Sequence, residues 1–477
     1  MLIVKRLHMW FIILMSLLLL ATAGWGVIWY YAQQRTVPED VSAGGIPLGG
    51  MNIEEAVGLL NRYEEALETR TLTVEAGEAA NGSKQWSAAD IGYKADFSKV
   101  RSALQRLTEG SVWERARYRY HFPKTYELEQ SWERDVFETA VRKEWGWIDL
   151  NEPADAVRTI TDDDRVEYKP HTNAYRLNVE ELSGKVEGWL LRAGDGTLSE
   201  EEKALKTELP VTVVQPKMTL EALKAEGVER KIIEFTTDFS SSAEGRAYNV
   251  SSTAKVLDGW HLAPGDIFDY GQIVRLTEDE YGYKEAPVIL NGKLVPGIGG
   301  GICQVSSTLY NAVLRTGLEI VERRNHSLPV SYLPIGQDAT FASGAINFRF
   351  KNTTGKHLII RTAVKDRQLT VKMFGTMPEN IRYDIESVTV QTIEPAVQEV
   401  ASASLPAGTR KVVQHGKPGY VVETFRTLVQ DGKEVSRERV SRDTYKAQPT
   451  VVNVGGNEGA PAPAPDSGEP LLEDGIG

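Results

Sequence analysis

The residue of this 477-residue chain best suited to do chemistry is Cys303, the only cysteine, which lies directly behind a run of glycines. Without a second cysteine it cannot form an internal disulfide, so it is a buried small hydrophobe, a thiol that pairs outside the chain, or a reactive thiol. After it, Val305, Leu309 and Val313 recur at the spacing of one buried helix face. Cys303 falls on the opposite, more polar face, which favours the reactive thiol.

The start of the expected helix and its polar face add further candidates. Ser306, Ser307 and Tyr310 share the face of Cys303 and are candidate substrate-binding residues. Gln304 either contacts the substrate or orients the loop before it. If the helix begins at or just before Cys303, the thiol lies at the positive end of the helix dipole, which lowers the pKa of a cysteine below its usual value of about 8.5.

The glycine run predicts a backbone pocket for an oxyanion. The N–H groups of Gly300, Gly301 and Ile302 converge beside the sulfur if the glycines adopt the tight turn that they permit. A nucleotide site is not expected, because the Lys-Ser/Thr of a P-loop is missing and the last position of G-x-G-x-x-G is broken. There is no H-E-x-x-H motif and no second cysteine, so the sequence predicts no metal site and no cofactor.

A thiol nucleophile needs a base, and His326 is the best candidate. It lies in the polar loop R-R-N-H-S between the expected helix and the strand-like segment P-V-S-Y-L, so the chain can fold it back over the helix start. His261 and His357 are expected at ordinary surface positions. The nearest later acid, Asp338, is a candidate third member that fixes the imidazole tautomer, although a backbone carbonyl can do the same.

Composition limits the partners and the number of domains. Lys and Arg together number 54 against 66 for Asp and Glu, a net charge of -12. This charge argues against nucleic acid as a partner. The length predicts roughly three domains.

The N-terminal segment predicts the compartment. Residues 9–31 carry no charge and are long enough to cross the ~30 Å hydrocarbon core of a membrane as a helix. Lys5 and Arg6 precede them, so a single-pass anchor keeps the N-terminus in the cytoplasm and the bulk of the chain outside. The alternative is a cleaved signal peptide, since residues 21–23 form an acceptable cleavage triplet. The apolar run that continues beyond them favours the anchor.

Residues 235–376 resemble the VanW-like domain of Gram-positive envelope proteins, a family named after an accessory protein of vancomycin-resistance clusters. The resemblance is carried by the motifs F-x-T-x-F-S-S-S, L-A-P-G-D-I-F, G-G-G-I-C-Q-V-S-S-T-L-Y-N-A and G-L-E-I-V-E-R-R-N-H-S. It implies that the domain is like an L,D-transpeptidase, since some members use the cysteine to join peptidoglycan stem peptides. Gly301 and Ile302 replace the His-Gly of the better-known S-H-G-C motif, so the base of that family cannot be carried over.

The resemblance also implies residues that bind the substrate. A peptidoglycan stem carries free carboxylates, so a basic group is expected near the thiol. Arg246 matches a recurrent family position together with Asn249. The alternatives are an ion pair of Arg246 at a helix start and a capping role for Asn249.

The flanking segments complete the organisation. Residues 40–228 hold a weak repeat, Y-K-A-D-F-S-K-V and Y-R-L-N-V-E-E-L, in which a strand runs into Asp96 or Asn178 as a helix N-cap. Two small α+β modules are therefore expected. They resemble peptidoglycan-binding modules, and the alternative is a spacer that holds the site away from the membrane.

The C-terminal part is expected to be all-β. Residues 386–456 read as strands with turn glycines and resemble the extracellular domain named for its five glycines, which is associated with wall polysaccharide. We expect it to add wall binding and no chemistry. The acidic tail is expected to be disordered. The predicted α+β chain thus comprises an anchor (1–35), two modules (40–228), a VanW-like domain (229–380), an all-β domain (386–456) and a tail (457–477).

Together these observations predict a cell-membrane protein that acts on peptidoglycan stem peptides and glycan by acyl transfer at Cys303. A thiol peptidase differs only in that water resolves the thioester. The alternative of another class is a non-catalytic peptidoglycan-binding or envelope-assembly factor, accessory to vancomycin resistance, in which Cys303 is structural.

Overall fold

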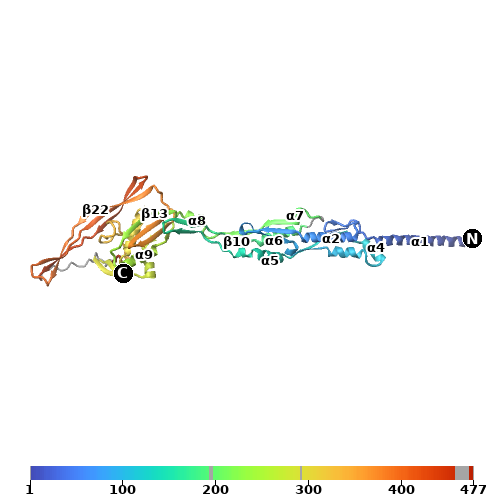
Figure 1. Cartoon of the computed structure of the whole chain (residues 1–477), viewed down its shortest axis with the longest axis horizontal. Helices are drawn as coiled ribbons and strands as arrows, with labels where there is room; N and C mark the ends of the chain where they lie inside the picture. Colours follow the sequence, from blue (N-terminus) through green and yellow to red (C-terminus); the bar gives the residue numbers. More distant parts are fainter. Residues whose placement is uncertain (1, 193–196, 291–292, 457–471, 476–477) are drawn as a thin grey trace. The chain divides into compact units, whose positions relative to one another are not determined.

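The chain forms two compact units in the computed structural model, which describes all residues except 1, 193–196, 291–292, 457–471 and 476–477 (Figure 1). The first unit comprises Met1–Asp155 and His171–Lys217, and the second comprises Ala156–Pro170 and Met218–Gly477. Helices and strands are both abundant, so the expected α+β class is confirmed.

The described elements of the first unit are short apart from α1. Its helices are α1 (Leu2–Gln33), α2 (Ile53–Glu68), α3 (Ser98–Arg106), α4 (Val112–Tyr120), α5 (Arg134–Trp145), α6 (Val179–Leu190), α7 (Glu200–Lys203) and the 3-10 turns Gly77–Ala79, Ala89–Ile91 and Gly146–Leu150. Its strands are β1 (Ser42–Ala43), β2 (Ile46–Pro47), β3 (Thr71–Glu75), β4 (Ser83–Ser87), β5 (Tyr93–Asp96), β6 (Thr125–Tyr126), β7 (Glu129–Trp132), β10 (Ala174–Leu177), β11 (Ala204–Glu208) and β12 (Val211–Val214).

Helix α1 is apolar along nearly its whole length. It is long and apolar enough to cross a membrane, a test that a signal sequence also passes. Arg119 of α4 donates to the carbonyl oxygens of Gln34 and Thr36 at 2.5 and 2.7 Å, and its guanidinium lies over the Tyr31 ring. The end of α1 is therefore fixed on the first unit.

The internal repeat corresponds to two strand–helix pairs, β5 with α3 and β10 with α6. Asn178 caps α6 as expected, because its side chain accepts a hydrogen bond from Glu181 N at 3.2 Å. Asp96 is not the N-cap of α3. It lies one residue before the N-cap Phe97 and accepts from Ser98 N at 2.6 Å.

The second unit contains the longer strands. Its helices are α8 (Leu220–Ala225), α9 (Glu244–Leu257), α10 (Tyr270–Tyr281) and α11 (Ile302–Leu314). Its strands are β8 (Val157–Ile160), β9 (Val166–Lys169), β13 (Arg230–Asp238), β14 (Trp260–Leu262), β15 (Ile267–Asp269), β16 (Glu285–Leu290), β17 (Lys293–Ile298), β18 (Glu319–Glu322), β19 (Arg349–Lys351), β20 (Leu358–Lys365), β21 (Gln368–Gly375), β22 (Ile381–Ile393), β23 (Val397–Ser402), β24 (Arg410–Gln414), β25 (Gly419–Gln430), β26 (Lys433–Tyr445), β27 (Thr450–Gly455) and β28 (Leu472–Glu473).

The hairpin β8–β9 belongs to the second unit, although the chain on either side of it belongs to the first. Arg158 of β8 forms a largely buried ion pair with Glu226 at 2.8 Å. Asp164 in the hairpin turn accepts from Lys231 and Lys372 at 2.7 and 2.6 Å. The hairpin is therefore held by charged pairs to the sheet that carries the core.

The core of the second unit lies between α11 and an antiparallel sheet in the order β13-β21-β20-β14. Alternate residues of β21, Leu369, Val371 and Met373, are fully buried, because successive side chains of a strand point to opposite faces. Helix α11 contacts β13 and β21 and is buried along its whole length.

The hairpin β16–β17 leads through a glycine turn into α11. Gly301 is the N-cap and has φ +107, a left-handed conformation. A Cβ on Gly300 would lie 2.4 Å from the carbonyl oxygen of Pro287 on β16. The close approach of two backbones thus requires glycine here, and it sets the start of α11 beside the hairpin.

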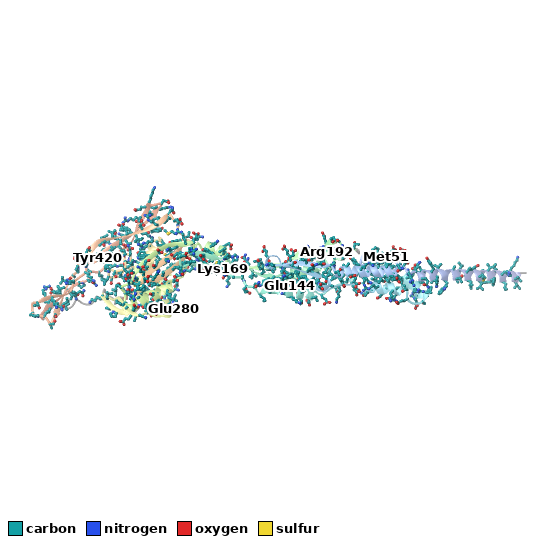
Figure 2. All side chains as sticks on the ribbon, viewed as in Figure 1. Met51, Glu144, Lys169, Arg192, Glu280 and Tyr420 are labelled. Atoms are coloured by element: carbon teal, nitrogen blue, oxygen red, sulfur yellow. The ribbon has the colours of Figure 1, made fainter. Side chains whose placement is uncertain are left out.

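Two further sheets, β22-β25-β26 and β23-β27-β24, form the C-terminal part of the second unit, drawn in orange around the label β22 in Figure 1. Figure 2 labels Tyr420 on β25. These strands contact the turn at Gly336: Thr424 Oγ1 donates to Gly336 O at 3.0 Å, and Gly336 N donates to Tyr445 Oη at 2.6 Å. The two parts of the unit are therefore hydrogen-bonded to each other.

The C-terminal tail is ordered where the structure describes it, so the expectation of disorder is wrong for residues 472–475. Strand β28 pairs antiparallel with β16, with Glu473 opposite Ile289. Gly475 forms a parallel bridge to Ala342. The prediction for residues 457–471 and 476–477 lies outside the described residues.

The turn at Gly336 gives a test of the contact with the C-terminal sheets. A Cβ there would lie 2.5 Å from Thr424 Oγ1, whereas Gly344, also left-handed, has open space at that position. We expect Gly344→Ala to cost about 1 kcal/mol of unfolding free energy for the backbone alone, and Gly336→Ala about 1–3 kcal/mol more for the clash. Urea denaturation measures both, and equal costs would contradict the close contact.

Candidate functional site

Cys303 is the second residue of α11 and is fully buried. Its sulfur accepts a hydrogen bond from Phe341 N at 3.1 Å and lies 3.5 Å from Phe341 O. Its own N–H donates to Asp474 Oδ1 at 2.7 Å. The expected position at a helix start is confirmed, and the first turn of that helix already binds a carboxylate.

The thiol of Cys303 is held in its protonated form. Burial raises the pKa of Cys303 well above 9.0, and the charge of Asp474 raises it further. The hydrogen bond from Phe341 N lowers this pKa, but its effect is smaller. Burial and a neighbouring anion thus outweigh the helix dipole. The expectation of a lowered pKa is therefore wrong for the conformation in which Asp474 is bound.

The polar face of α11 is as buried as the apolar face, so its side chains are not exposed to a substrate in this conformation. Ser306 Oγ donates to Ala339 O at 2.6 Å, and Ser307 Oγ accepts from Ala339 N at 2.9 Å. The buried Tyr310 ring lies under the guanidinium of Arg323, 5.1 Å from its centroid. These side chains hold the segment that returns over the helix.

Gln304 orients the elements around the helix start. Its Nε2 donates to Thr237 Oγ1 and Asp238 O, both at 3.0 Å, and its Oε1 accepts from Arg246 Nη1 at 2.8 Å. Arg246 also donates to Ser242 Oγ at 2.8 Å, and among the described residues it has no ion-pair partner at a helix start or elsewhere. Its guanidinium charge is thus not neutralised.

Asn249 is neither a cap nor free to bind substrate. It lies inside α9 and is fully buried. Its amide donates to Gly300 O at 3.0 Å and Lys284 O at 2.9 Å, and its carbonyl accepts from Lys284 N at 2.8 Å. Asn249 therefore fixes the glycine turn.

The predicted oxyanion groups are not all available. Ile302 N donates to Gly299 O at 3.2 Å. The turn itself requires glycine at both preceding positions, because a Cβ on Gly300 would clash with β16 and Gly301 has a left-handed conformation. At this helix start, the N–H that binds a carboxylate is that of Cys303 itself.

His326 and Asp338 form a buried pair. Nδ1 of His326 lies 2.6 Å from Asp338 Oδ2, and the same oxygen accepts from His326 N at 2.7 Å. The Nδ1–H therefore points at the carboxylate. Nε2 is buried and has no hydrogen-bond partner among the described residues. The segment 329–333 after His326 is a loop and not the strand that its residues predicted.

The charges around this pair set both pKa values. Burial alone would raise the pKa of Asp338, but the hydrogen bond and charge of His326, with the charge of Arg323, lower it well below 3.8. Burial alone would lower the pKa of His326, but Asp338, followed by Asp474 and Glu473, raises it above 6.5. The pair thus favours an ionised Asp338 and makes the His326 imidazole more basic than an exposed one.

Strand β26 supplies two further residues around Asp338, and the sequence analysis did not predict them. Tyr445 Oη donates to Asp338 Oδ1 at 2.5 Å. Arg323 donates to Asp338 O at 2.6 Å and binds both oxygens of Asp443 at 2.6 and 2.7 Å. Asp443 and Tyr445 are two apart on β26 and share a strand face, but the sequence does not reveal which partner that face meets.

The loop that carries His326 is also bound by this strand. Asn325 Nδ2 donates to Thr444 O at 3.1 Å, and Lys446 N donates to Ser327 O at 2.9 Å. The all-β part was expected to contribute no chemistry of its own, yet it holds the candidate base and acid in position.

Consecutive tail residues bridge the regions of Cys303 and His326. Asp474 accepts from Cys303 N, and Glu473 accepts from the backbone N of Ser327, next to His326, at 2.9 Å. The Cα atoms of neighbouring residues such as Glu473 and Asp474 are ~3.8 Å apart. The backbone at Cys303 and the backbone at Ser327 therefore both contact the same two-residue stretch of the tail.

His261 is exposed and His357 half-buried, in line with the expected surface positions, but the two side chains are in contact. Their rings stack, with Nδ1 of His357 2.9 Å from Nε2 of His261. With Glu226 they form a group whose ligand atoms lie within 4.8 Å of one another, a donor set of the kind that zinc accepts. The carboxylate of Glu226 is already paired with Arg158.

Two parts of the chain match known families. Residues 245–374 match the family described as VanW like protein, and residues 385–457 match the G5 domain. The chain therefore carries a VanW-like domain followed by a C-terminal G5 domain, which confirms both resemblances.

Individual relatives cover part of the chain. The uncharacterized protein YoaR of Bacillus subtilis is 38% identical over 177 residues, which are 37% of this chain and 58% of that protein. The vancomycin B-type resistance protein VanW of Enterococcus faecalis is 30% identical over 155 residues, 31% of this chain and 56% of that protein. The matches thus span less than two thirds of either relative. The solved IgA1 protease G5 domain is 32% identical over 17% of this chain and 96% of its own, with a TM-score of 0.14.

The raised pKa of His326 gives the stability a defined pH dependence. The unfolded imidazole titrates near 6.5 and the folded one higher. Its contribution is therefore fully present below pH 6.5 and is lost as the pH rises through the folded value. Between pH 6.5 and about 8.5, below most thiol titration, we expect the unfolding free energy of the wild type to fall relative to that of His326→Gln. Parallel pH profiles would refute this.

The hydroxyl of Tyr445 is a second test, because it donates to a buried carboxylate. Tyr445→Phe is expected to cost about 1.5–3 kcal/mol of unfolding free energy. The matched control is Tyr420→Phe, since Tyr420 pairs with Tyr445 across β25 and β26 and its hydroxyl has no hydrogen bond to another described residue. The control should cost less than about 0.5 kcal/mol. A similar cost for both would show that the hydroxyl does not support Asp338.

Proposed function

We propose that this protein is a cell-envelope enzyme that transfers an acyl group between peptidoglycan stem peptides, with Cys303 as nucleophile and His326 as base. The observation that carries the proposal is the buried His326–Asp338 pair, which has an unpartnered Nε2 and whose loop is bound by the tail residue next to the one that binds Cys303. Buried polar atoms normally have a hydrogen-bond partner, and a catalytic role is one explanation for an atom that has none.

The domain content supports the compartment. A VanW-like domain followed by a G5 domain fits a protein of the cell wall. Helix α1, with Lys5 and Arg6 in its first turns, supports a single-pass anchor with the N-terminus inside and the rest of the chain outside.

The reaction needs one proton carrier and one nucleophile. The Cys303 thiol gives its proton to Nε2 of His326, and the thiolate attacks a carbonyl carbon of the donor stem. The C–N bond to the terminal D-Ala breaks, and the leaving amine takes the proton from the imidazolium. An acceptor amine then attacks the thioester, its proton passes to His326, and the thiolate leaves and is reprotonated.

The surrounding groups have supporting roles in this mechanism. Asp338 holds His326 with Nδ1–H toward it, so that Nε2 can accept a proton. The Cys303 N–H, which binds a carboxylate here, stabilises the oxyanion. Arg246 supplies an unneutralised positive charge for a substrate carboxylate.

A second candidate function is favoured by the burial of the thiol. Cys303 is fully buried and its pKa is raised by that burial and by Asp474. Such a cysteine also fits a non-catalytic wall-binding or envelope-assembly protein, in which α11 is simply the central core helix. The two candidates differ in whether Cys303 ever forms a covalent bond with a stem peptide.

Intact mass after incubation with a defined tetrapeptide muropeptide separates the two candidates. We expect an acyl adduct on the wild type, none on Cys303→Ala, and a rate roughly 10²-fold lower for His326→Ala. His261→Ala, which changes a histidine outside the site, should react like the wild type. No adduct in the full chain or after removal of residues 472–477 would favour the non-catalytic candidate.

A further inference from the structure

The described part of the tail lies in a groove with backbone on both sides. On one side, β28 pairs antiparallel with β16, with Glu473 opposite Ile289. On the other, Asp474 N donates to Phe341 O at 3.3 Å, and the next tail residue bridges the residue after Phe341. Both backbone edges of this short stretch are thus used, as they are when an extended peptide is added to a sheet.

The two tail carboxylates are bound by neutral donors. Glu473 Oε2 accepts from Ser327 N at 2.9 Å and Ser327 Oγ at 3.0 Å, and Asp474 Oδ1 accepts from Cys303 N at 2.7 Å. Both side chains are buried, and neither has a Lys or Arg ion-pair partner among the described residues. Backbone N–H groups at a helix start and in a loop are the donors that proteins use to receive anions.

A third group lies near the two tail carboxylates. His326 is fully buried, its Nε2 has no hydrogen-bond partner among the described residues, and the charges of Glu473 and Asp474 act on it in addition to that of Asp338. An imidazole with an unpartnered nitrogen near two bound carboxylates supports a ligand site, since a ligand-binding or catalytic role is one explanation for such an atom.

We propose that this groove, formed by β16, the segment at Phe341, the start of α11 and the loop at Ser327, binds the carboxylate-bearing extended peptide on which Cys303 acts, and that residues 472–475 are an internal ligand that occupies it. The identity of that peptide as a peptidoglycan stem rests on the proposed function. A bound stem adds a strand to β16 and brings a carboxylate or its scissile carbonyl to the N–H of Cys303.

Occupation by the tail accounts for the state of the thiol. Asp474 covers the start of α11, and its charge helps to keep Cys303 protonated. A tethered ligand has an effective concentration of the order of millimolar, so a weak external peptide competes only where it is locally abundant, as a polymer substrate is. The enzyme is therefore closed until substrate displaces its own tail.

Alkylation of the folded protein tests the occupation without any need for catalysis. Iodoacetamide should modify Cys303 at least about tenfold faster when residues 472–477 are removed, because reaction of the thiol then no longer requires local opening of the tail. The full-length double variant Glu473→Gln, Asp474→Asn should do the same while keeping the shape of the strand. The matched control, Glu200→Gln with Glu201→Gln, makes the same charge change on exposed α7 and should react like the wild type.

The alkylation result is decisive with either variant. If the truncated chain melts early by circular dichroism, the full-length double variant carries the test. Equal alkylation rates for the wild type and a folded tail variant would overturn the proposal.

Protection experiments then test the ligand class. A synthetic peptide of residues 468–477 should protect Cys303 of the truncated chain from alkylation, and the same peptide with Gln and Asn at positions 473 and 474 should protect at least about tenfold less well. A tetrapeptide muropeptide should also protect and should compete with the tail peptide.

The outcomes separate the groove from the chemistry. Protection by the tail peptide but not by the muropeptide would overturn the assignment of the stem as ligand. Protection by the muropeptide without an acyl adduct on any variant would support the groove and refute the proposed enzyme. An adduct that forms undiminished in the presence of saturating tail peptide would leave the enzyme standing and refute the groove.

Discussion

The site depends on one buried carboxylate, that of Asp338. A carboxylate buried away from water needs hydrogen-bond donors and positive charge around it. Its two oxygens accept from the backbone and ring of His326 and from Tyr445, and Arg323 lies beside it. Removing one partner would leave a buried charge without compensation, which is far more costly than losing a surface ion pair. The segments that supply these donors therefore have to remain in contact with Asp338.

This requirement joins two sequence families into one site. Arg323 and His326 lie in the VanW-like match, whereas Asp443 and Tyr445 lie in the G5 match. A domain associated with wall attachment thus supports the geometry of the candidate base. The two matched domains are not independent modules here, because the contact between them passes through a buried ion pair and not through a flexible linker.

The sequence predicted the parts of the site that follow from local pattern. A helix that begins at the glycine run, a cysteine in its first turn, and an imidazole with a neighbouring acid follow from spacing and residue type, and the structure has all of them. The burial of Ser306 and Ser307 was missed because their hydroxyls are satisfied by Ala339, a contact that periodicity does not reveal. Tyr445 was missed for the same reason, since its partner is remote in the chain.

The tail shows a further limit of composition. Its acidic, low-complexity character predicted disorder, but two of its carboxylates are bound by specific N–H groups. Composition describes how much apolar surface a segment can bury. It does not describe a groove elsewhere in the chain that is ready to receive that segment, so short ordered stretches inside such tails escape sequence analysis.

The placement of the hairpin β8–β9 has a consequence for how proteolysis can separate the two units. Because residues 156–170 belong to the second unit while both flanks belong to the first, the chain passes between the units at three places. After a single cut near residue 155, the segment 171–217 still pairs with the first unit, where β11 lies beside β3. One proteolytic nick there would therefore not separate the second unit from the first, and separation would require that sheet to come apart or the chain to be cut again.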